Sequence, residues 1–362
     1  MKKLRFSQWI LLAGFVLGIC LPLPLWMLIG SKAASSGSEM RMLAERPVLT
    51  AENYAEYPGL FEEYLGDHLP FKDALVAGNA ATDYLLFRSS SDRVIVGKED
   101  WLFYAAKMDG DPVSDYQGSV LYGKKQLASI AERLCAQRDK LAAEGTRFVI
   151  FFAPNKERVY AEYMPEQYGA PAEEYRLKQL ADYLQENTDL EVVNSLEAVL
   201  QAKNETEAPL WYKTDTHWND LGAYVGSREL LGTLGIELPA LSECTVEAGE
   251  PTSGDLARIL HLESLFEKKD REYRIAEFEL RCEIQAEEGY HAGVNAHAEG
   301  ADPRRIYFCR DSYADAMIAY VGNCFTDSRF VYRAFYTEED RKAFAPDIFV
   351  YEIVERYLNE LL

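Results

Sequence analysis

The sequence predicts an α/β fold in which a mostly parallel sheet carries helices on both faces. The run Phe148–Phe152 is continuously apolar, which is typical of a strand covered on both sides. Apolar residues recur at helical spacing before this run, at Leu127, Ile130 and Leu134. Further strand candidates alternate with helical stretches toward the end of the chain, and this alternation favours parallel strands joined by crossover helices.

Residues 1–32 are predicted to be a membrane anchor. Basic residues in the first five positions precede an uncharged stretch, residues 6–30, and about 20 apolar residues can cross a bilayer. The basic flank should stay inside, so the rest of the chain is expected outside. A cleaved signal peptide, with the small residues 33–36 at its cleavage site, is the alternative. We expect an uncleaved anchor, and therefore a single-pass protein of the cell membrane with an extracytoplasmic catalytic domain.

Residues 33–104 are expected to form a helical segment and a short strand pair that pack on the core. The stretch Ala51–Leu86 has helical character interrupted at Pro58 and Pro70. The run Arg93–Tyr104 predicts two short strands joined by a turn.

Residues 105–362 are predicted to be the catalytic domain. Gly145 is placed to end the helix that precedes the first strand. The stripe Leu177–Leu184 predicts another helix, and a helix is also expected from about Tyr313 and at the end of the chain, to Leu362. The later strand candidates are Leu190–Val193, Ile306–Cys309, Phe330–Tyr332 and Ile348–Tyr351.

Residues 241–300 interrupt this alternation, and we interpret them as an insertion or lid rather than an independent domain. Within them Phe278, Leu280, Cys282 and Ile284 alternate with charged residues or glutamine. Such a pattern predicts an exposed antiparallel strand, so the insertion should contain β structure.

The composition excludes one class of partner. A formal net charge of −21 argues against nucleic acid, because phosphate binding needs clustered lysine and arginine. The six cysteines show no CxxC spacing, so they predict no metal site. Cys244 and Cys282 could form a disulfide, but the pattern does not establish a pairing.

The string Trp211–Asp220 contains the most informative pair of residues. Asp215 and His217 are two positions apart, which in extended backbone puts both side chains on one face, roughly 6–7 Å apart at Cα. The carboxylate can then accept a hydrogen bond from imidazole Nδ1–H and leave Nε2 as a base. An isolated Asp-x-His is common by chance, but the flanking Tyr212 and Trp218 make this string more specific.

A second string supplies a nucleophile. The apolar strand candidate 306–309 runs into Arg310, Asp311 and Ser312, where a helix is expected to begin. Ser312 would then lie at a helix N-terminus, which favours an oxyanion. The competing interpretation is that Asp311 or Ser312 only caps the helix. With Asp215 and His217, however, Ser312 completes a nucleophile, a base and an orienting acid.

Asn155 follows the carboxyl end of the strand 148–152, where open α/β sheets bind ligands. It could donate a hydrogen bond to an oxyanion, or it could merely shape the turn after Pro154.

Of the five histidines, only His217 has a suitable acidic neighbour, and His291 and His297 are not spaced as metal ligands. The sequence contains no GxSxG, GxxxxGK[ST], HExxH or GxGxxG motif, and we expect neither a metal nor a cofactor.

At these residues the sequence resembles the SGNH-hydrolase-like O-acetyltransferases, in particular the periplasmic alginate O-acetyltransferase group. A related bacterial group with Asp-His-His-Trp at this place is also similar. The resemblance covers most of the chain beyond the anchor. It is carried by Val94–Tyr104, Pro154–Pro165, Lys213–Tyr224 and the junction that leads to Ser312.

The resemblance implies the site and the fold, an SGNH-hydrolase-like sheet. The family's Gly-Asp-Ser turn matches residues 310–312, with Arg310 in place of the glycine, where a side chain could obstruct an acyl donor. The family's catalytic acid and base match Asp215 and His217. Asn155, Arg310, Tyr212 and Trp218 are candidates for oxyanion or substrate contacts.

The resemblance also implies a role. A membrane-bound acyltransferase would supply acetyl groups, and this chain would place them on an extracytoplasmic polysaccharide through an acetyl-Ser312 intermediate. Two alternatives stay open: a carbohydrate acetylesterase that uses the same triad, and a non-catalytic polysaccharide-binding or scaffold protein.

Overall fold

The computed structural model describes residues 6–21, 24, 43–68, 72–287 and 293–362. The chain divides into two compact units, one made of residues 1–90 with 258–262 and the other of residues 91–257 with 263–362. The second unit contains every strand and therefore the sheet that positions the site.

The first unit is helical. Its helices are α1 (Phe6–Cys20), α3 (Tyr57–Asp67) and α4 (Lys72–Leu85). Pro58 lies in the first turn of α3, where its missing N–H leaves no bond unmade. Among the described residues no helix combines the length and the hydrophobicity that a membrane span requires. Part of the predicted anchor, residues 1–5, 22, 23 and 25–32, lies outside the described residues, as does Pro70.

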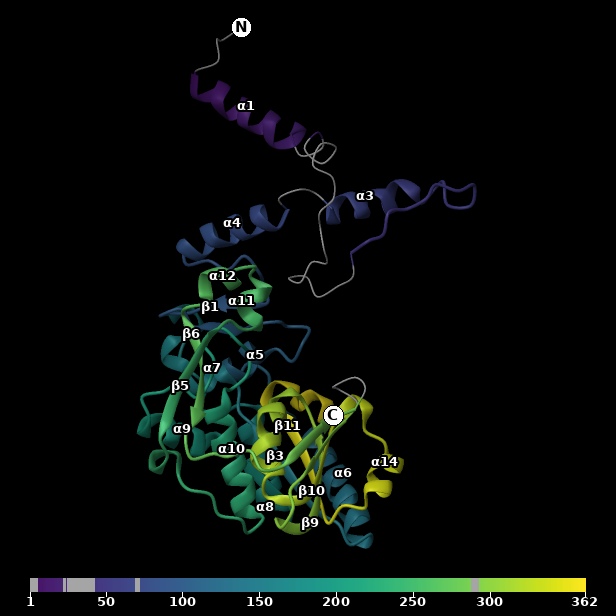
Figure 1. The fold of residues 1–362 in the computed structure, drawn as a ribbon, viewed down its shortest axis with the longest axis vertical. Coiled ribbons are helices and arrows are strands. Elements are labelled where there is room, and N and C mark those ends of the chain that lie inside the picture. The colour runs from purple at the N-terminus through teal and green to yellow at the C-terminus, as the bar shows by residue number, and fades with distance from the viewer. Residues whose placement is uncertain (1–5, 22–23, 25–42, 69–71, 288–292) are drawn as a thin grey trace. The chain divides into compact units, whose positions relative to one another are not determined.

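The second unit is built on a seven-stranded mixed sheet (Figure 1). Five strands run parallel, and two more are added at one edge by antiparallel pairing. The predicted α/β fold is therefore confirmed, and the antiparallel edge comes from residues predicted to be an insertion. In spatial order the strands are β4 (Glu191–Asn194), β3 (Arg147–Ala153), β11 (Ile348–Val354), β9 (Asp302–Arg310), β10 (Phe325–Tyr332), β8 (Val294–His297) and β7 (Glu283–Ala286).

Both faces of the sheet are covered, which explains the continuous apolar run in β3. Phe151 packs toward helix α10, where its ring lies 6.4 Å from that of Trp218 and close to Gly226. Phe148 points to the opposite face, where it meets Phe349 and residues of helix α6. The long helices are α6 (Lys124–Ala143), α8 (Arg176–Asn187), α9 (Leu196–Glu205) and α10 (Asp220–Thr233).

Short helices complete the second unit. After α6 the chain turns at Gly145, whose φ of +83° favours glycine, as the sequence predicts. The shorter α-helices are α5 (Pro112–Gln117), α7 (Lys156–Val159), α11 (Asp255–Ile259), α12 (Glu263–Phe266), α13 (Ile318–Gly322) and α14 (Glu338–Phe344). The 3-10 helices are η1 (Ala161–Tyr163), η2 (Glu166–Tyr168), η3 (Leu241–Glu243), η4 (Ser312–Met317), η5 (Arg333–Phe335) and η6 (Glu355–Leu361).

The predicted strand pair near residue 100 is present as a hairpin of β1 (Val94–Val96) and β2 (Leu102–Tyr104). The predicted helix from Tyr313 is the 3-10 helix η4 followed by the short α13. The predicted terminal helix is the 3-10 helix η6 rather than an α-helix.

The predicted insertion contains β structure, but the alternating strand begins later than expected. The segment β5 (Val246–Thr252) pairs with β6 (Asp270–Ile275) in a separate hairpin. Residues 278–282 are not a strand because Phe278 packs on Tyr320, with ring centroids 4.5 Å apart. The side chain of Asn323 also takes the backbone N–H groups of Arg281 and Cys282. These N–H groups are then not available to a strand ladder.

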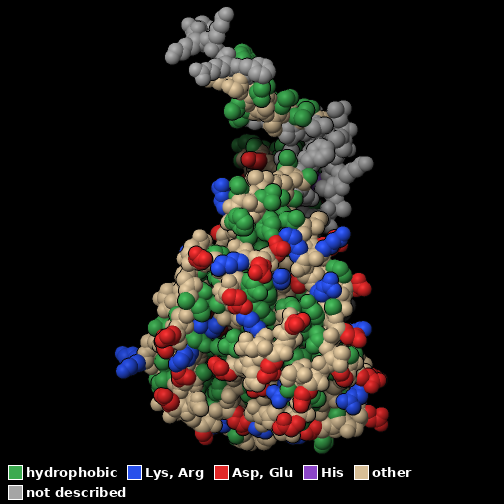
Figure 2. Space-filling model, turned by 90° about the vertical axis from the view of Figure 1, so that its left-hand side faces the viewer, with side chains coloured by type: hydrophobic (Ala, Val, Ile, Leu, Met, Phe, Trp, Pro, Cys, Tyr) green, Lys and Arg blue, Asp and Glu red, His purple; other side chains and the backbone are tan. Residues whose placement is uncertain are grey.

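The charged side chains on the surface are of both signs. On the face drawn in Figure 2, acidic and basic side chains are interspersed, and the basic ones form no continuous patch.

Candidate active site

Three neighbouring strands of the sheet bring the candidate residues to one edge. Ser312 follows β9, Asn155 follows β3, and β11 lies between these two strands. Because the three strands are parallel, their carboxyl ends meet at the same edge, where open α/β sheets bind ligands. The loop that carries Asp215 and His217 reaches this edge just before α10.

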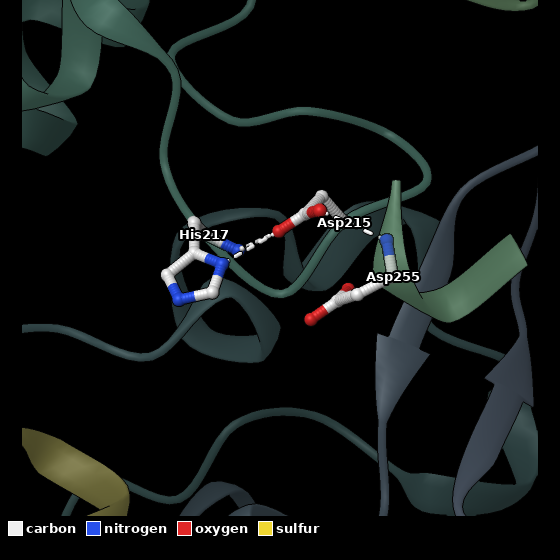
Figure 3. A group of neighbouring side chains, drawn as sticks. All are labelled: Asp215, His217 and Asp255. Atoms are coloured by element: carbon white, nitrogen blue, oxygen red, sulfur yellow. Dashed lines mark hydrogen bonds and ion pairs between the residues drawn. The ribbon is translucent and has the colours of Figure 1, made fainter. Parts of the chain in front are cut away.

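Asp215, His217 and Ser312 form a continuous hydrogen-bonded chain. His217 Nδ1 lies 2.6 Å from Asp215 Oδ1, and the Ser312 hydroxyl lies 2.8 Å from His217 Nε2. Figure 3 shows the ring with Nδ1 turned to the carboxylate and Nε2 turned away from it. With the proton on Nδ1, Nε2 can accept the proton of the serine hydroxyl. The geometry is that of an activated nucleophile.

Residues 213–217 are bent rather than extended, contrary to what the Asp-x-His interpretation requires, yet the side chains of Asp215 and His217 still meet. Trp211 and Trp218 form an isolated antiparallel bridge, so residues 211–218 make a loop whose ends are paired. The Asp215 Oδ1 atom also accepts the backbone N–H of His217 at 3.0 Å, and Oδ2 accepts that of Asp255 at 2.9 Å. The carboxylate is therefore held from both sides, and its orientation toward the ring is set by the backbone.

The electrostatics of the pair favour a proton on the imidazole. Burial would raise the pKa of Asp215, but the bond to His217 and its charge outweigh burial and hold that pKa below its usual range. Burial would lower the pKa of His217, but the bond to Asp215 and its charge raise it above the ordinary value. The neighbouring charge of Arg356 works in the opposite direction on His217. The pair therefore stabilises the imidazolium that a general base becomes.

Asp311 performs the capping role that the sequence offered as the competing interpretation for this turn. Its carboxylate accepts the backbone N–H groups of Tyr313 and Val354, and it pairs with Arg333. The cap thus ties the start of η4 to the end of β11, and the Ser312 hydroxyl is left for His217.

A family model described as "SGNH hydrolase-like domain, acetyltransferase AlgX" matches residues 94–289, which is more than half of the chain. The chain belongs to this family. The resemblance seen in the sequence is thus confirmed, and with it the expected class of enzyme, an acyltransferase. The family's description names an acetyltransferase, so the esterase alternative is the less well supported of the two enzymes.

The chain is also similar to individual relatives. A probable alginate O-acetylase AlgJ from Azotobacter vinelandii is 27% identical over 366 residues, which cover 96% of this chain and 88% of that protein. The corresponding protein of Pseudomonas syringae is 27% identical over 262 residues, which cover 71% of this chain and 61% of that protein. The solved structure of Bacillus cereus PatB1 with a sulfonyl adduct has a TM-score of 0.50 at 12% identity and covers 73% of this chain and 96% of that chain. This last likeness supports the fold.

Arg310, which stands where the family has glycine, points away from the serine. Its side chain is fully buried, pairs with Asp315 at 2.5 Å, and lies 4.1 Å above the ring of Tyr332. Its hydrogen bonds go to Asp311 and Asp315, and Ser312 and His217 keep their own hydrogen bond. We assign Arg310 a structural role at the end of β9.

Trp218 and Tyr212 differ in how exposed their side chains are to a substrate. Trp218 is 1% exposed, and its indole N–H donates to the backbone carbonyl of Tyr313 at 2.8 Å. It therefore joins the loop of His217 to the turn of Ser312 and has no free surface for a substrate. Tyr212 is partly exposed on the same loop, where burial raises the pKa of its phenol.

Asn155 is buried next to the site. Its Oδ1 accepts the backbone N–H of Arg356 at 3.2 Å, and its Nδ2 has no hydrogen-bond partner among the described residues. An unpaired buried amide is costly, because the group has lost its water without gaining a partner. The amide is thus available to a ligand.

Two further residues hold the loop of Asp215, and the sequence interpretation missed both. Lys156 is 2% exposed, and its ammonium donates to the carbonyls of Leu102, Lys213 and Asp215 at 2.7–2.9 Å. Burial lowers the pKa of Lys156 to about 8. The sequence feature that could have identified Lys156 is its position directly after Asn155, at the carboxyl end of a buried strand.

Asp255 is the second missed residue, because it lies in the region interpreted as an insertion. It accepts the hydroxyl and the backbone N–H of Thr216 at 2.7 and 2.8 Å. Together Asp215, His217 and Asp255 offer donor atoms within 4.8 Å of one another, a spacing that a metal ion could use (Figure 3). Each carboxylate is already hydrogen-bonded to backbone, so the three residues fit a hydrogen-bonded relay better than an ion site.

Proposed function

We propose that the chain transfers acetyl groups to hydroxyl groups of an extracytoplasmic polysaccharide through an acetyl-enzyme on Ser312. The observation that carries the proposal is the relay in which Asp215, His217 and Ser312 are joined by hydrogen bonds of 2.6 and 2.8 Å. The class of acceptor is supported by the relatives, which are named as probable alginate O-acetylases.

In the first half-reaction Ser312 Oγ attacks the carbonyl carbon of an acetyl donor while His217 Nε2 takes its proton. The tetrahedral intermediate collapses, and the leaving group receives that proton. In the second half-reaction an acceptor hydroxyl gives its proton to His217 and attacks the acetyl carbon, and Ser312 leaves with the proton. Asp215 keeps the ring in the required tautomer throughout and stabilises the imidazolium.

We assign Asn155 as a donor to the oxyanion of both intermediates. Its amide nitrogen is buried and without a partner among the described residues, while its oxygen is fixed by the backbone of Arg356. A donor that is fixed in advance costs no reorganisation when the negative charge develops.

The proposal includes a location and a supplier. The apolar N-terminal stretch, of which α1 is the described part, would anchor the chain in the cell membrane with the second unit outside. A membrane-bound acyltransferase would then deliver acetyl groups at the same surface. Fractionation of cells that express the full chain, with and without an alkaline wash, would separate an anchored protein from a released one.

The test of the chemistry is the hydrolysis of a chromogenic acetate by the full chain and by Ser312→Ala. We expect the substitution to remove nearly all turnover, because no other group in the relay can carry the acetyl. Ser227→Ala is the control, since Ser227 is a buried serine of the same unit whose hydroxyl has no partner among the described residues. Activity that survives Ser312→Ala unchanged would refute the proposal.

Transfer is distinguished from hydrolysis by the acceptor. We expect an oligosaccharide to raise the rate of acetyl loss from the enzyme and to appear as an acetylated product. Release of free acetate alone, with no dependence on an acceptor, would instead indicate the esterase.

A further inference from the structure

Arg356 is a buried cation at the edge of the sheet where Ser312 lies. It is the second residue of η6, directly after β11, and it is 6% exposed. Its guanidinium lies over the rings of Tyr104, Tyr313 and Tyr357, at 5.4, 5.4 and 4.9 Å from their centroids. The three rings surround the cation with apolar surface and exclude water from it.

Arg356 differs from the other buried arginines of the described chain in having no acidic partner. Arg176 pairs with Asp115 and Arg310 with Asp315, each at 2.5 Å, and Arg341 pairs with Glu144 at 2.6 Å. Among the described residues no carboxylate pairs with the guanidinium of Arg356 within 4.0 Å. Its Nε has no hydrogen-bond partner, while its side chain bonds to that of Tyr357.

The acidic groups near Arg356 are already engaged elsewhere. Asp311 pairs with Arg333 and caps η4, and Glu157 accepts the backbone N–H of Tyr104. A buried charge without a partner is expensive, and proteins keep such a group when it has a use. We therefore expect the partner of Arg356 to be an anion that forms during the reaction.

The position of Arg356 indicates which anion. Its backbone N–H donates to Asn155 Oδ1 at 3.2 Å, so it shares a strand end with the second unpaired donor of the site. The ring of Tyr313, the residue after Ser312, lies next to both Arg356 and His217, with the imidazole centroid 5.3 Å away. The charge of Arg356 also acts on His217, where it opposes the larger effect of Asp215, which raises the pKa of the imidazole. Arg356 and His217 thus lie beside the same tyrosine ring, in the turn that carries Ser312.

We propose that the guanidinium of Arg356, together with the amide of Asn155, binds the oxyanion that forms on the acyl group attached to Ser312. The inference rests on the proposed function. Ser312 Oγ forms a bond to the acetyl carbon as His217 takes its proton, and the carbonyl π electrons move to the oxygen. That oxygen becomes the anion that Arg356 binds. The electron pair re-forms the C=O bond when the leaving group departs with the proton.

The experiment compares Arg356→Met with Arg356→Lys in the hydrolysis of a chromogenic acetate. We expect Arg356→Met to lower kcat by about 10²–10³, the usual effect of removing one oxyanion donor, with KM changed little. Arg356→Lys should lie between this variant and the wild type, because it keeps the charge. The affinity of methylboronic acid, which adds to a serine oxygen as a tetrahedral anion, should fall in parallel with kcat.

Arg341→Met is the matched control, since Arg341 is as deeply buried but has an acidic partner on the surface of α14 and α6. We expect this control to lower Tm and leave kcat unchanged, because it removes the ion pair that joins Arg341 to Glu144. Arg356→Met should leave Tm unchanged or raise it, because it removes an unpaired buried charge. A Tm loss in Arg356→Met comparable to the control would contradict the assignment of a functional cation.

The outcomes separate the two proposals. If the wild type is active and Ser312→Ala is not, but Arg356→Met retains kcat or the affinity for methylboronic acid, the inference on Arg356 is wrong and the proposed function stands. If Arg356→Met raises only KM, the cation binds a group on the substrate instead, which also overturns the inference. If the wild type neither turns over the ester nor binds methylboronic acid, the proposed function fails and this inference fails with it.

Discussion

Asp215→Asn tests how the carboxylate controls His217. In the wild type, Asp215 Oδ1 accepts two hydrogen bonds from His217, from Nδ1 at 2.6 Å and from the backbone at 3.0 Å. Oδ2 accepts the backbone N–H of Asp255 at 2.9 Å. An asparagine has one oxygen, and placing it toward His217 keeps two of these bonds, whereas placing it toward Asp255 keeps one. The variant should therefore keep the productive tautomer and lose mainly the charge.

The expected loss of kcat follows from these changes in hydrogen bonding. A hydrogen bond to a charged group contributes about 1.5–3 kcal/mol, more than a neutral one. A neutral bond contributes about 0.5–1.5 kcal/mol, so replacing the charged bond by a neutral one loses about 1–1.5 kcal/mol. If this is lost in the transition state, kcat falls about 5- to 12-fold, because about 1.4 kcal/mol corresponds to a factor of ten. A loss of about 10⁴, as in enzymes whose histidine adopts the wrong tautomer, would refute the reasoning.

The pH dependence has a definite sign. His217 acts as a base in its neutral form, so the rate falls as pH drops through its pKa, which Asp215 holds above the ordinary value. Without the negative charge that pKa falls, and the acid limb of kcat/KM should move to lower pH. The measurement is ester hydrolysis between about pH 4 and 9. An acid limb that stays in place or moves to higher pH would contradict the proposed pairing.

Two further predictions concern the loop of Asp215. Lys156→Met should lower the free energy of unfolding by about 2–4 kcal/mol and reduce kcat, because three carbonyls lose a buried donor. Denaturant unfolding measures the first effect, and unchanged stability would show that the ammonium does not hold the loop. Gly254→Ala should reduce both stability and kcat, because the added Cβ would lie 2.4 Å from Asp215 Cβ. Gly232→Ala in α10 meets no atom within 4 Å and should be neutral or stabilising, so equal effects of the two alanines would contradict this steric account.

The strands of the parallel core could be predicted because their sequences depend little on their surroundings. The run Phe148–Phe152 is apolar at every position, and a strand that is covered on both faces buries all of these side chains. The pair Asp215 and His217 was also predictable from its i, i+2 spacing, although the backbone that brings the two side chains together is bent rather than extended. The segment 278–282 was not, because the side chain of Asn323, forty residues away, takes its N–H groups.

The sequence by itself determined the local features of this protein: the buried strands, the acid-base pair and the serine at a strand end. The tertiary structure alone decided what lies around them. It brought Ser312 to His217 across 95 positions, joined Lys156 to the loop of Asp215, and left Arg356 without an acidic partner among the described residues. The reason is that a spacing pattern reports contacts only between residues close in the chain, whereas these contacts depend on the order of the strands in the sheet.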